Sequence, residues 1–170
     1  MARATPGYFF GSKAALYEAV LRRVHEQRTE ALNAACQPLH RWARDAEAGH
    51  ESLREAIAAA IDGYIAFLVA RPAFARLIEW ESLTDATRLP TDLSTSFSDA
   101  LRAVHRVRRT RGLRDFDVTT VVVAVVSLCF LPVAHASTFN AGGGINTLQP
   151  RFCRRYQVQV VDSVLGMLIP

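Results

Sequence analysis

Apolar residues recur at intervals of three and four positions along most of this chain. The clearest case precedes Ala70, where Ile57, Ile61, Tyr64 and Leu68 follow one another at helical spacing. A helix turns once every 3.6 residues, so these positions share one face. The pattern predicts an all-α protein with helices over residues 12–35, 39–46, 52–70, 72–83, 91–111 (or 94–111), 118–139 and 150–168.

Polar residues, prolines and glycines indicate where the helices begin and end. Ser12 is placed to cap the first helix, and Pro38 is expected to end or kink it because proline lacks an N–H. Ser52 and Glu55 form an S-x-x-E capping-box signature at the start of the third predicted helix. The run RRTR before Gly112 is expected to be the last turn of the 91–111 helix, since cations and a following glycine suit a C-terminal end.

The segment 118–134 is exceptional because it contains no charged residue. Its centre, VVVAVV, is β-branched, so periodicity alone leaves a strand or a buried helix open. The length of the segment and its helical surroundings favour a helix. The segment is at the short limit for a membrane span of about 20 residues, so burial between neighbouring helices or in a dimer seam is the better interpretation.

Composition narrows the class of protein. The chain has 170 residues, of which 50% are hydrophobic, enough for a domain with its own core. The net charge of +4 favours acidic partners only mildly, because the arginines are spread along the chain. Three cysteines far apart in the sequence predict neither a disulfide framework nor a metal site, and together with the absence of a visible signal peptide they favour a reducing cytoplasm.

The stretch 3–20, RATPGYFFGSKAALYEAV, carries the most specific pattern. An aromatic run, Tyr8 to Phe10, precedes Gly11, Ser12 and Lys13, and Leu16 follows in the next turn. This arrangement resembles the second half of the helix-turn-helix DNA-binding domain in TetR-family transcriptional repressors. The segment RPAFARLIEWESL resembles a motif in the ligand-binding domain of the same family.

The resemblance implies a division into two parts. Residues 1–25 would be the remnant of the DNA-binding domain, with the recognition helix and the start of the connecting helix. Residues 26–170 would form the C-terminal ligand-binding and dimerisation domain. The family has two further helices before the stretch that begins here at Met1, so weak or absent specific binding to operator DNA is expected of this chain.

The same resemblance implies which residues face DNA. They are Arg3, Thr5, Gly7, Tyr8 and Lys13. A cation in the first turn of a helix is unfavourable for the helix dipole, so Lys13 is better explained by an external anion such as a DNA phosphate. Pro6 and Gly7 depart from the family, which more often has Leu and Tyr at these positions.

A pocket between the helices is expected, and the resemblance implies that a small apolar or aromatic effector binds there and relieves repression. Ordinary core packing is the alternative role for every candidate residue. His105 and His135 stand out because an imidazole on an apolar face needs a polar partner. The candidates are Tyr64, Phe67, Ile78, Phe97, Leu101, His105, Phe130 and His135.

The resemblance also implies a homodimer formed through the last two helices. No enzyme is expected, since the histidines lack metal-ligand spacing, and Glu79 and Glu81 would point to different faces of a helix. No cofactor is implied. Two alternatives stay open at this point: a dimeric small-molecule sensor or dominant-negative partner that does not bind DNA, and a small membrane-associated protein.

Overall fold

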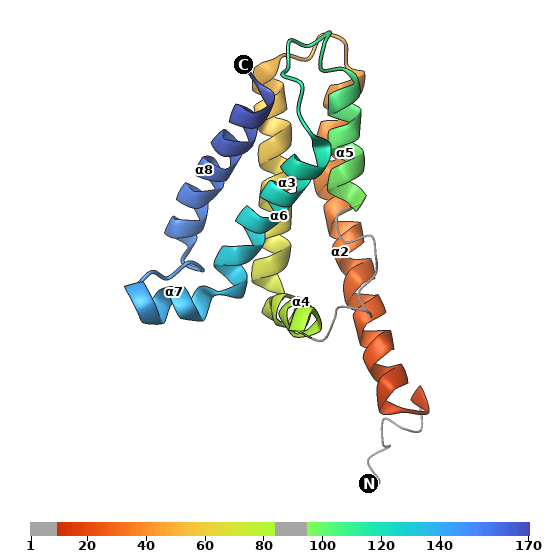
Figure 1. Ribbon diagram of the computed structural model, residues 1–170, viewed down its shortest axis with the longest axis vertical. Coiled ribbons are helices and arrows are strands. Elements are labelled where there is room, and N and C mark those ends of the chain that lie inside the picture. The colour runs from red at the N-terminus through yellow and green to blue at the C-terminus, as the bar shows by residue number, and fades with distance from the viewer. Residues whose placement is uncertain (1–9, 84–94) are drawn as a thin grey trace.

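The computed structural model describes residues 10–83 and 95–170, and within these ranges the chain is all-α. The helices are α2 (Lys13–Arg44), α3 (His50–Ala70), α4 (Pro72–Leu83), α5 (Thr95–Arg106), α6 (Val118–Ala134), α7 (Ala136–Gly143) and α8 (Pro150–Leu168). The long helices α2 and α3 run side by side with the shorter α5, whereas α6 and α8 diverge from them, and α4 and α7 lie across the end nearer the N-terminus (Figure 1).

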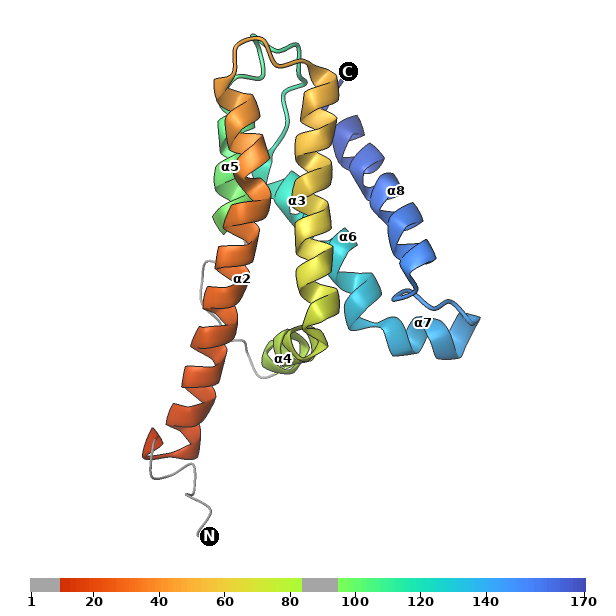
Figure 2. The ribbon, with the colours of Figure 1, turned by 180° about the vertical axis from the view of Figure 1, so that it is seen from behind.

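Helix α2 is the longest element, and its N-terminal half projects beyond the rest of the molecule in both views (Figures 1 and 2). It begins as predicted, because the Ser12 hydroxyl accepts a hydrogen bond from the backbone N–H of Ala15 at 3.1 Å. Of the two predicted effects of Pro38, an end or a kink, the end is wrong, since α2 continues to Arg44. Burial of Leu39 and Trp42 just beyond the proline offsets the backbone hydrogen bond that proline cannot make.

Helix α3 begins two residues earlier than the capping-box signature predicted. Its N-cap is Gly49, and the Ser52 hydroxyl donates to the Gly49 carbonyl instead of receiving a backbone N–H. The capping-box prediction is therefore wrong. Helix α3 ends at Ala70, and Pro72 opens α4, so the predicted boundary at this proline is confirmed.

The hydrophobic core lies where α3 packs against α2, α6 and α8, and α5 adds buried residues to it from between α2 and α6. Leu53, Ile61 and Leu68 from α3 are almost completely buried. At Gly63 the backbones of α2 and α3 come unusually close, since a Cβ added there would lie 2.4 Å from the Cβ of Ala35. Only glycine permits this approach, so Gly63 determines how closely α2 lies against the core.

The loop after α5 is organised by Arg111. Helix α5 ends at Arg106, so the prediction that RRTR forms its last turn is wrong. The Arg111 guanidinium donates to the carbonyls of Ala46 and Ala48 at 2.9 and 2.7 Å, donates also to the Asp45 carbonyl, and stacks over Trp42. These contacts tie the α5–α6 loop to the α2–α3 loop. Gly112 follows at a φ of +63°, a conformation that favours glycine.

The valine-rich segment is a helix, as its length and surroundings favoured, but it ends at Ala134 rather than near residue 139. A break at His135 separates α6 from α7. Because Pro132 has no N–H, the Leu128 carbonyl lacks its usual backbone donor, and the Tyr156 hydroxyl from α8 donates to it at 2.8 Å. The buried Thr147 hydroxyl donates to the Pro132 carbonyl at 2.6 Å. Side chains outside α6 therefore compensate for the proline and hold the break.

Candidate functional site

Polar side chains are buried where α4 crosses the inner surfaces of α2 and α3. His25 and Arg28 of α2 are 5% and 4% exposed, and Glu81 of α4 is 2% exposed. Aromatic rings lie among them, with Phe74 edge-on to both His25 and Phe67 at centroid distances of 6.0 and 5.2 Å. We call the set His25, Arg28, Tyr64, Phe67, Phe74 and Glu81 the polar-aromatic cluster.

Burying the polar side chains of this cluster lowers the free energy that folding gains. Removing an ion from water carries a penalty of several kcal/mol even after relaxation, which partner groups only partly offset. The remaining core is built from aliphatic and aromatic side chains, so the buried charges are concentrated at this end of the bundle. A mixture of apolar walls and a few converging polar groups is typical of small-molecule sites.

The cluster is also connected to the projecting half of α2. The Tyr17 hydroxyl donates to the Glu81 carboxylate, which joins α2 directly to α4. Burial raises the pKa of Tyr64, as does the neighbouring Cys129, whereas the charge of Arg28 acts in the opposite direction. The Tyr64 hydroxyl therefore stays protonated at neutral pH, where it can serve as a hydrogen-bond donor.

The structure brings some of the predicted effector residues together. Tyr64 and Phe67 belong to the polar-aromatic cluster, and the Phe97 ring lies edge-on to Tyr64 at 5.7 Å. Phe97 and Leu101 line a small space of about 10 Å³, large enough for one water at most. These two residues pack the core here, which is the alternative role considered for them.

The other predicted residues lie elsewhere. His105 is at the opposite end of α5, where its Nε2 lies 3.3 Å from an Asp115 oxygen and its ring meets Phe116 edge-on. His135 is half-exposed at the α6–α7 break, 3.2 Å from a Glu79 oxygen on α4. Both imidazoles have polar partners within the protein, as a histidine on a mainly apolar face requires. Ile78 and Phe130 are partly buried against the core.

The sequence analysis missed four members of the cluster: His25, Arg28, Phe74 and Glu81. A signal was present in α2, because His25 and Arg28 occupy the same helical face as the buried Leu21 and Leu32. A polar residue in an apolar register predicts a buried polar group. Glu81 gave a comparable signal in α4, because it follows Phe74 and Ile78 at helical spacing.

The predicted DNA-facing end is described only in part. Arg3, Thr5, Gly7 and Tyr8 lie outside the described residues. Lys13 is exposed in the first turn of α2, which contains no acidic residue. The side chain is therefore accessible at the N-terminal end of α2, in the half of the helix that projects from the molecule in Figure 1.

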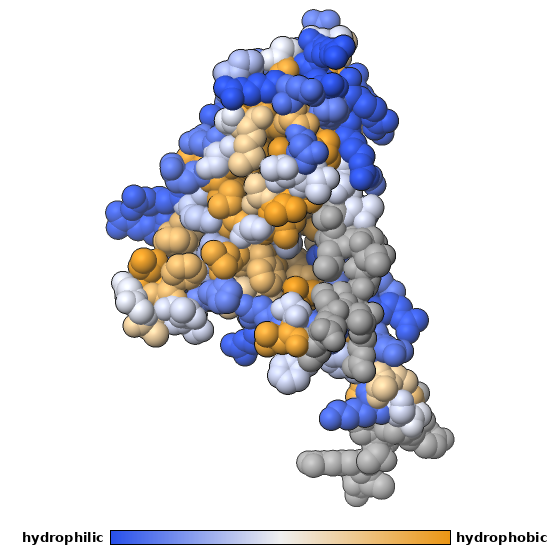
Figure 3. Space-filling view, viewed as in Figure 1, coloured by the Kyte–Doolittle hydropathy of each residue, from blue (hydrophilic) through white to orange (hydrophobic). Residues whose placement is uncertain are grey.

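A second surface is formed by the outer face of α6. Thr120, Val123, Ser127 and Leu131 are exposed at helical spacing, and Val123 and Leu131 are 59% and 49% exposed. No charged residue interrupts this face. Figure 3 shows apolar side chains gathered in the middle of this side of the molecule, with hydrophilic ones concentrated towards the upper end.

None of the helices within residues 10–83 and 95–170 combines the length and the apolar composition needed to cross a membrane alone. The 17 residues of α6 owe their hydrophobic character to one face that packs in the core and another that forms the surface just described.

Comparison with known proteins identifies the domain. The sequence profile of the tetracyclin repressor-like C-terminal domain matches residues 54–164, about two thirds of the chain, from α3 to α8. No curated protein matches the sequence. The helical architecture and this match agree with the resemblance found in the sequence, and the chain therefore belongs to the TetR family of regulators.

Proposed function

We propose that this chain is an effector-responsive transcriptional repressor of the TetR type, in which a small apolar or aromatic molecule binds at the polar-aromatic cluster. The single observation that carries the proposal is the burial of His25, Arg28 and Glu81 beside three aromatic rings, inside the domain that matches the family. Such a site could bind an apolar molecule through its rings and orient it through its few polar groups.

The cluster is well placed to act on DNA binding. It includes residues of α2 itself, and the Tyr17–Glu81 hydrogen bond links α4 to the projecting half of that helix. A ligand shifts an equilibrium between two conformations only by its difference in affinity for them. An effector that moves α4 would change the position of α2, and with it the position of any DNA-reading residues before Lys13.

The residues assigned to DNA contact, Arg3, Thr5, Gly7, Tyr8 and Lys13, keep that role as part of the proposal. So does the division of the chain at residue 25, although α2 runs through this position without interruption. The exposed position of Lys13 supports a phosphate contact, because phosphate contacts orient a protein on DNA without reading its sequence.

The proposed binding of an effector is tested by thermal shift with a panel of small apolar and aromatic compounds. Compounds that raise the melting temperature are titrated against Tyr64→Phe, which removes one buried hydroxyl and keeps the ring. Tyr156→Phe is the matched control, because its hydroxyl is bonded to α6 away from the cluster. We expect Tyr64→Phe to weaken binding several-fold or more and the control to leave it unchanged; equal effects would contradict the assignment.

The proposal also includes a dimer, in which α6 and α8 form a symmetric interface. A C2 interface uses the same patch on both subunits, and the uncharged face of α6 is suited to pairing with its own copy. Val123→Glu would place a carboxylate in that seam, whereas Val20→Glu introduces the same charge at an exposed valine of α2. Light scattering should show a dimer for wild type and Val20→Glu and a monomer for Val123→Glu. A wild-type protein that is monomeric at micromolar concentration would refute the proposed dimer interface.

One alternative remains from the same observations: a dimeric small-molecule sensor, or a dominant-negative partner, that does not bind DNA. In vitro selection from random duplex DNA distinguishes the two. Specific binding is expected to be weak in this chain, so a repressor should enrich a palindromic site only weakly and lose that binding on Lys13→Gln, whereas a sensor without DNA binding should enrich none.

A further inference from the structure

Helix α4 makes a carboxylate contact with a different neighbour on each side. Glu81 accepts a hydrogen bond from the Tyr17 hydroxyl in the projecting half of α2, and a Glu79 oxygen lies 3.2 Å from Nε2 of His135 at the α6–α7 break. Glutamates two positions apart point to different faces of a helix, so this one short helix reaches two neighbours. We call α4 with these two contacts the α4 bridge.

The α4 bridge lies across the bundle. Helix α4 turns by 87° from the axis of α3, and in Figures 1 and 2 it crosses the end of the molecule between α2 and α6. Isolated helices of 12 residues are marginal in water, so the position of α4 depends on its tertiary contacts. Only Phe74, Ala75 and Glu81 of this helix are buried, and one of these is the carboxylate that contacts α2.

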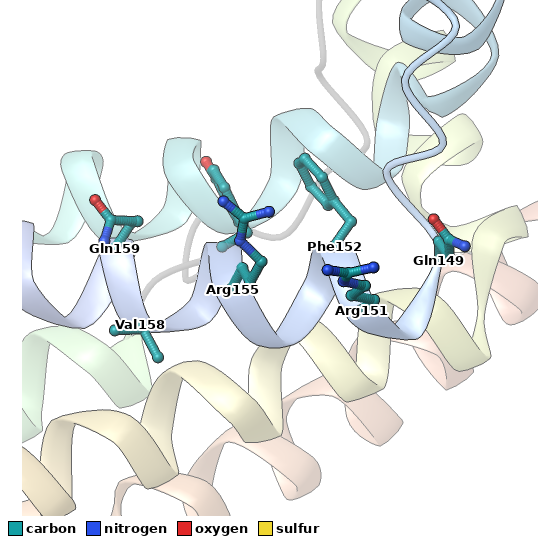
Figure 4. Close-up of a pocket in the computed structure, with 7 residues that line it drawn as sticks. Gln149, Arg151, Phe152, Arg155, Val158 and Gln159 are labelled. Atoms are coloured by element: carbon teal, nitrogen blue, oxygen red, sulfur yellow. The ribbon is translucent and has the colours of Figure 1, made fainter.

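The α6–α7 end of the bridge is held by the start of α8. His135 lies where α6 and α7 meet at a bend of 63°. The Thr147 hydroxyl donates to the Pro132 carbonyl, three residues before His135. Phe152 lines a small space together with Pro132 and Val133, and Figure 4 shows this ring extending from the first turns of α8. The position of His135 therefore follows from the packing of α8 against α6.

The same turns of α8 belong to the surface assigned to the dimer. Phe152 and Tyr156 are stacked with centroids 5.5 Å apart, and both line the open groove that Figure 4 shows. A partner subunit that covers this groove would contact the rings that pack against the α6–α7 break. Contacts at the dimer surface can therefore reach His135 through a single layer of side chains.

The contact between Glu79 and His135 is suited to a helix that moves. The two side chains are 33% and 46% exposed, and partly exposed pairs of this kind add little to the stability of a whole protein. A small difference in free energy is nevertheless enough to change the populations of two positions of one helix.

We propose that the α4 bridge transmits changes at the α6–α7 break to the projecting half of α2, with Glu79 and His135 as positioning residues. Loss of their contact releases α4, and the Tyr17–Glu81 hydrogen bond passes this release on to α2. The consequence for repression rests on the proposed function, because the position of α2 matters there for DNA. The bridge itself requires neither DNA nor an effector.

Hydrogen–deuterium exchange of the full chain, read by mass spectrometry, tests the bridge. We expect His135→Ala and Glu79→Ala each to speed exchange roughly two- to fivefold in α4 and in residues 17–28 of α2, the factor that corresponds to a partly exposed contact. The double variant should match either single variant, because both remove the same contact. Residues 53–68 of α3, in the core, should not change. Ser137→Ala and Arg76→Ala are the matched controls, since they shorten exposed side chains of α7 and α4.

Tyr17→Phe tests whether the effect reaches α2 through Glu81. In this background His135→Ala should still speed exchange in α4 but add nothing in α2. The proposal is overturned if His135→Ala leaves α2 unchanged in the otherwise wild-type chain, or if its effect on α2 persists beside Tyr17→Phe. Equal changes in residues 53–68, or in the two control variants, would likewise overturn it by indicating a general loss of stability.

The thermal-shift titrations described above keep this proposal separate from the proposed function. A compound that binds at the polar-aromatic cluster, in a protein without these exchange responses, would refute the bridge alone. The expected exchange responses in a protein that binds no compound of the panel would support the bridge and count against the effector site.

Discussion

The close approach of α2 and α3 at Gly63 permits a sharp prediction about stability. A Cβ at this position would lie 2.4 Å from the Cβ of Ala35, at least about 1 Å short of the 3.5–4.0 Å optimum for two carbon atoms. The atom it meets is a methyl group attached directly to the backbone of α2, so no side-chain rotation relieves the clash. Gly63→Ala therefore requires the two helices to move apart.

The expected magnitude is the difference between two effects. Overpacking a core costs about 1–3 kcal/mol, whereas replacing glycine by alanine inside a helix gains about 0.5–1 kcal/mol. Gly63→Ala should accordingly reduce the free energy of unfolding by up to about 2.5 kcal/mol, with a middle value of about 1 kcal/mol. Gly166→Ala in α8 is the matched control, because nothing lies within 4 Å of its added Cβ, and it should be neutral or stabilise by up to about 1 kcal/mol.

Urea denaturation followed by circular dichroism at 222 nm measures both variants. The double variant Gly63→Ala/Ala35→Gly restores space by moving the methyl group from α2 to α3, so it should be more stable than the sum of the two single changes predicts. A Gly63→Ala protein as stable as Gly166→Ala, or strict additivity in the double variant, would refute the view that this contact limits the distance between α2 and α3.

Three further predictions follow from the polar contacts and from burial. Thr147→Val should reduce the free energy of unfolding by about 1–2 kcal/mol by leaving the Pro132 carbonyl without its donor, and Thr138→Val at an exposed position of α7 should cost less in the same urea titration. The hydrogen bond and charge of Arg108 lower the pKa of Asp115, so this carboxylate stabilises the fold above the ordinary carboxyl pKa of about 4 and ceases to do so as pH falls through its lowered value. The difference in melting temperature between wild type and Asp115→Asn should therefore be present at pH 7 and shrink below pH 4. A difference that is independent of pH would contradict this role of Asp115. Burial raises the pKa of Cys36 and of Cys129 to about 12, so a thiol reagent at pH 8 should label neither residue in the native protein. The same reagent should label all three cysteines of the chain in urea. Rapid labelling of Cys36 in the native protein would show that the core opens.

The sequence alone determined the fold class and most of the helices. The spacing of apolar residues predicted α3, α4 and α8 closely, and Ser12 and Arg71-Pro72 marked real boundaries. These features are local, because helix periodicity, caps and proline geometry depend on residues within one or two turns. The aromatic run before Lys13 and the segment after Arg71 were likewise enough to indicate the family that the profile match then established.

Tertiary structure decided what local signals could not. Pro38 stays inside α2 because Leu39 and Trp42 are buried beyond it, whereas α6 breaks after Pro132, where Thr147 and Tyr156 supply hydrogen bonds from elsewhere in the chain. Two prolines with the same local chemistry thus have different outcomes.

At the candidate sites, too, tertiary packing decided what local signals could not. Phe97 and His105 were predicted from their side-chain types, and packing places one in the core and the other against Asp115. Arg28 and Glu81 are drawn into the interior by the crossing of α4 over α2, a geometry that depends on contacts between residues more than fifty positions apart. Periodicity reports which face of a helix is buried, but only the assembled helices decide which polar side chains share that interior.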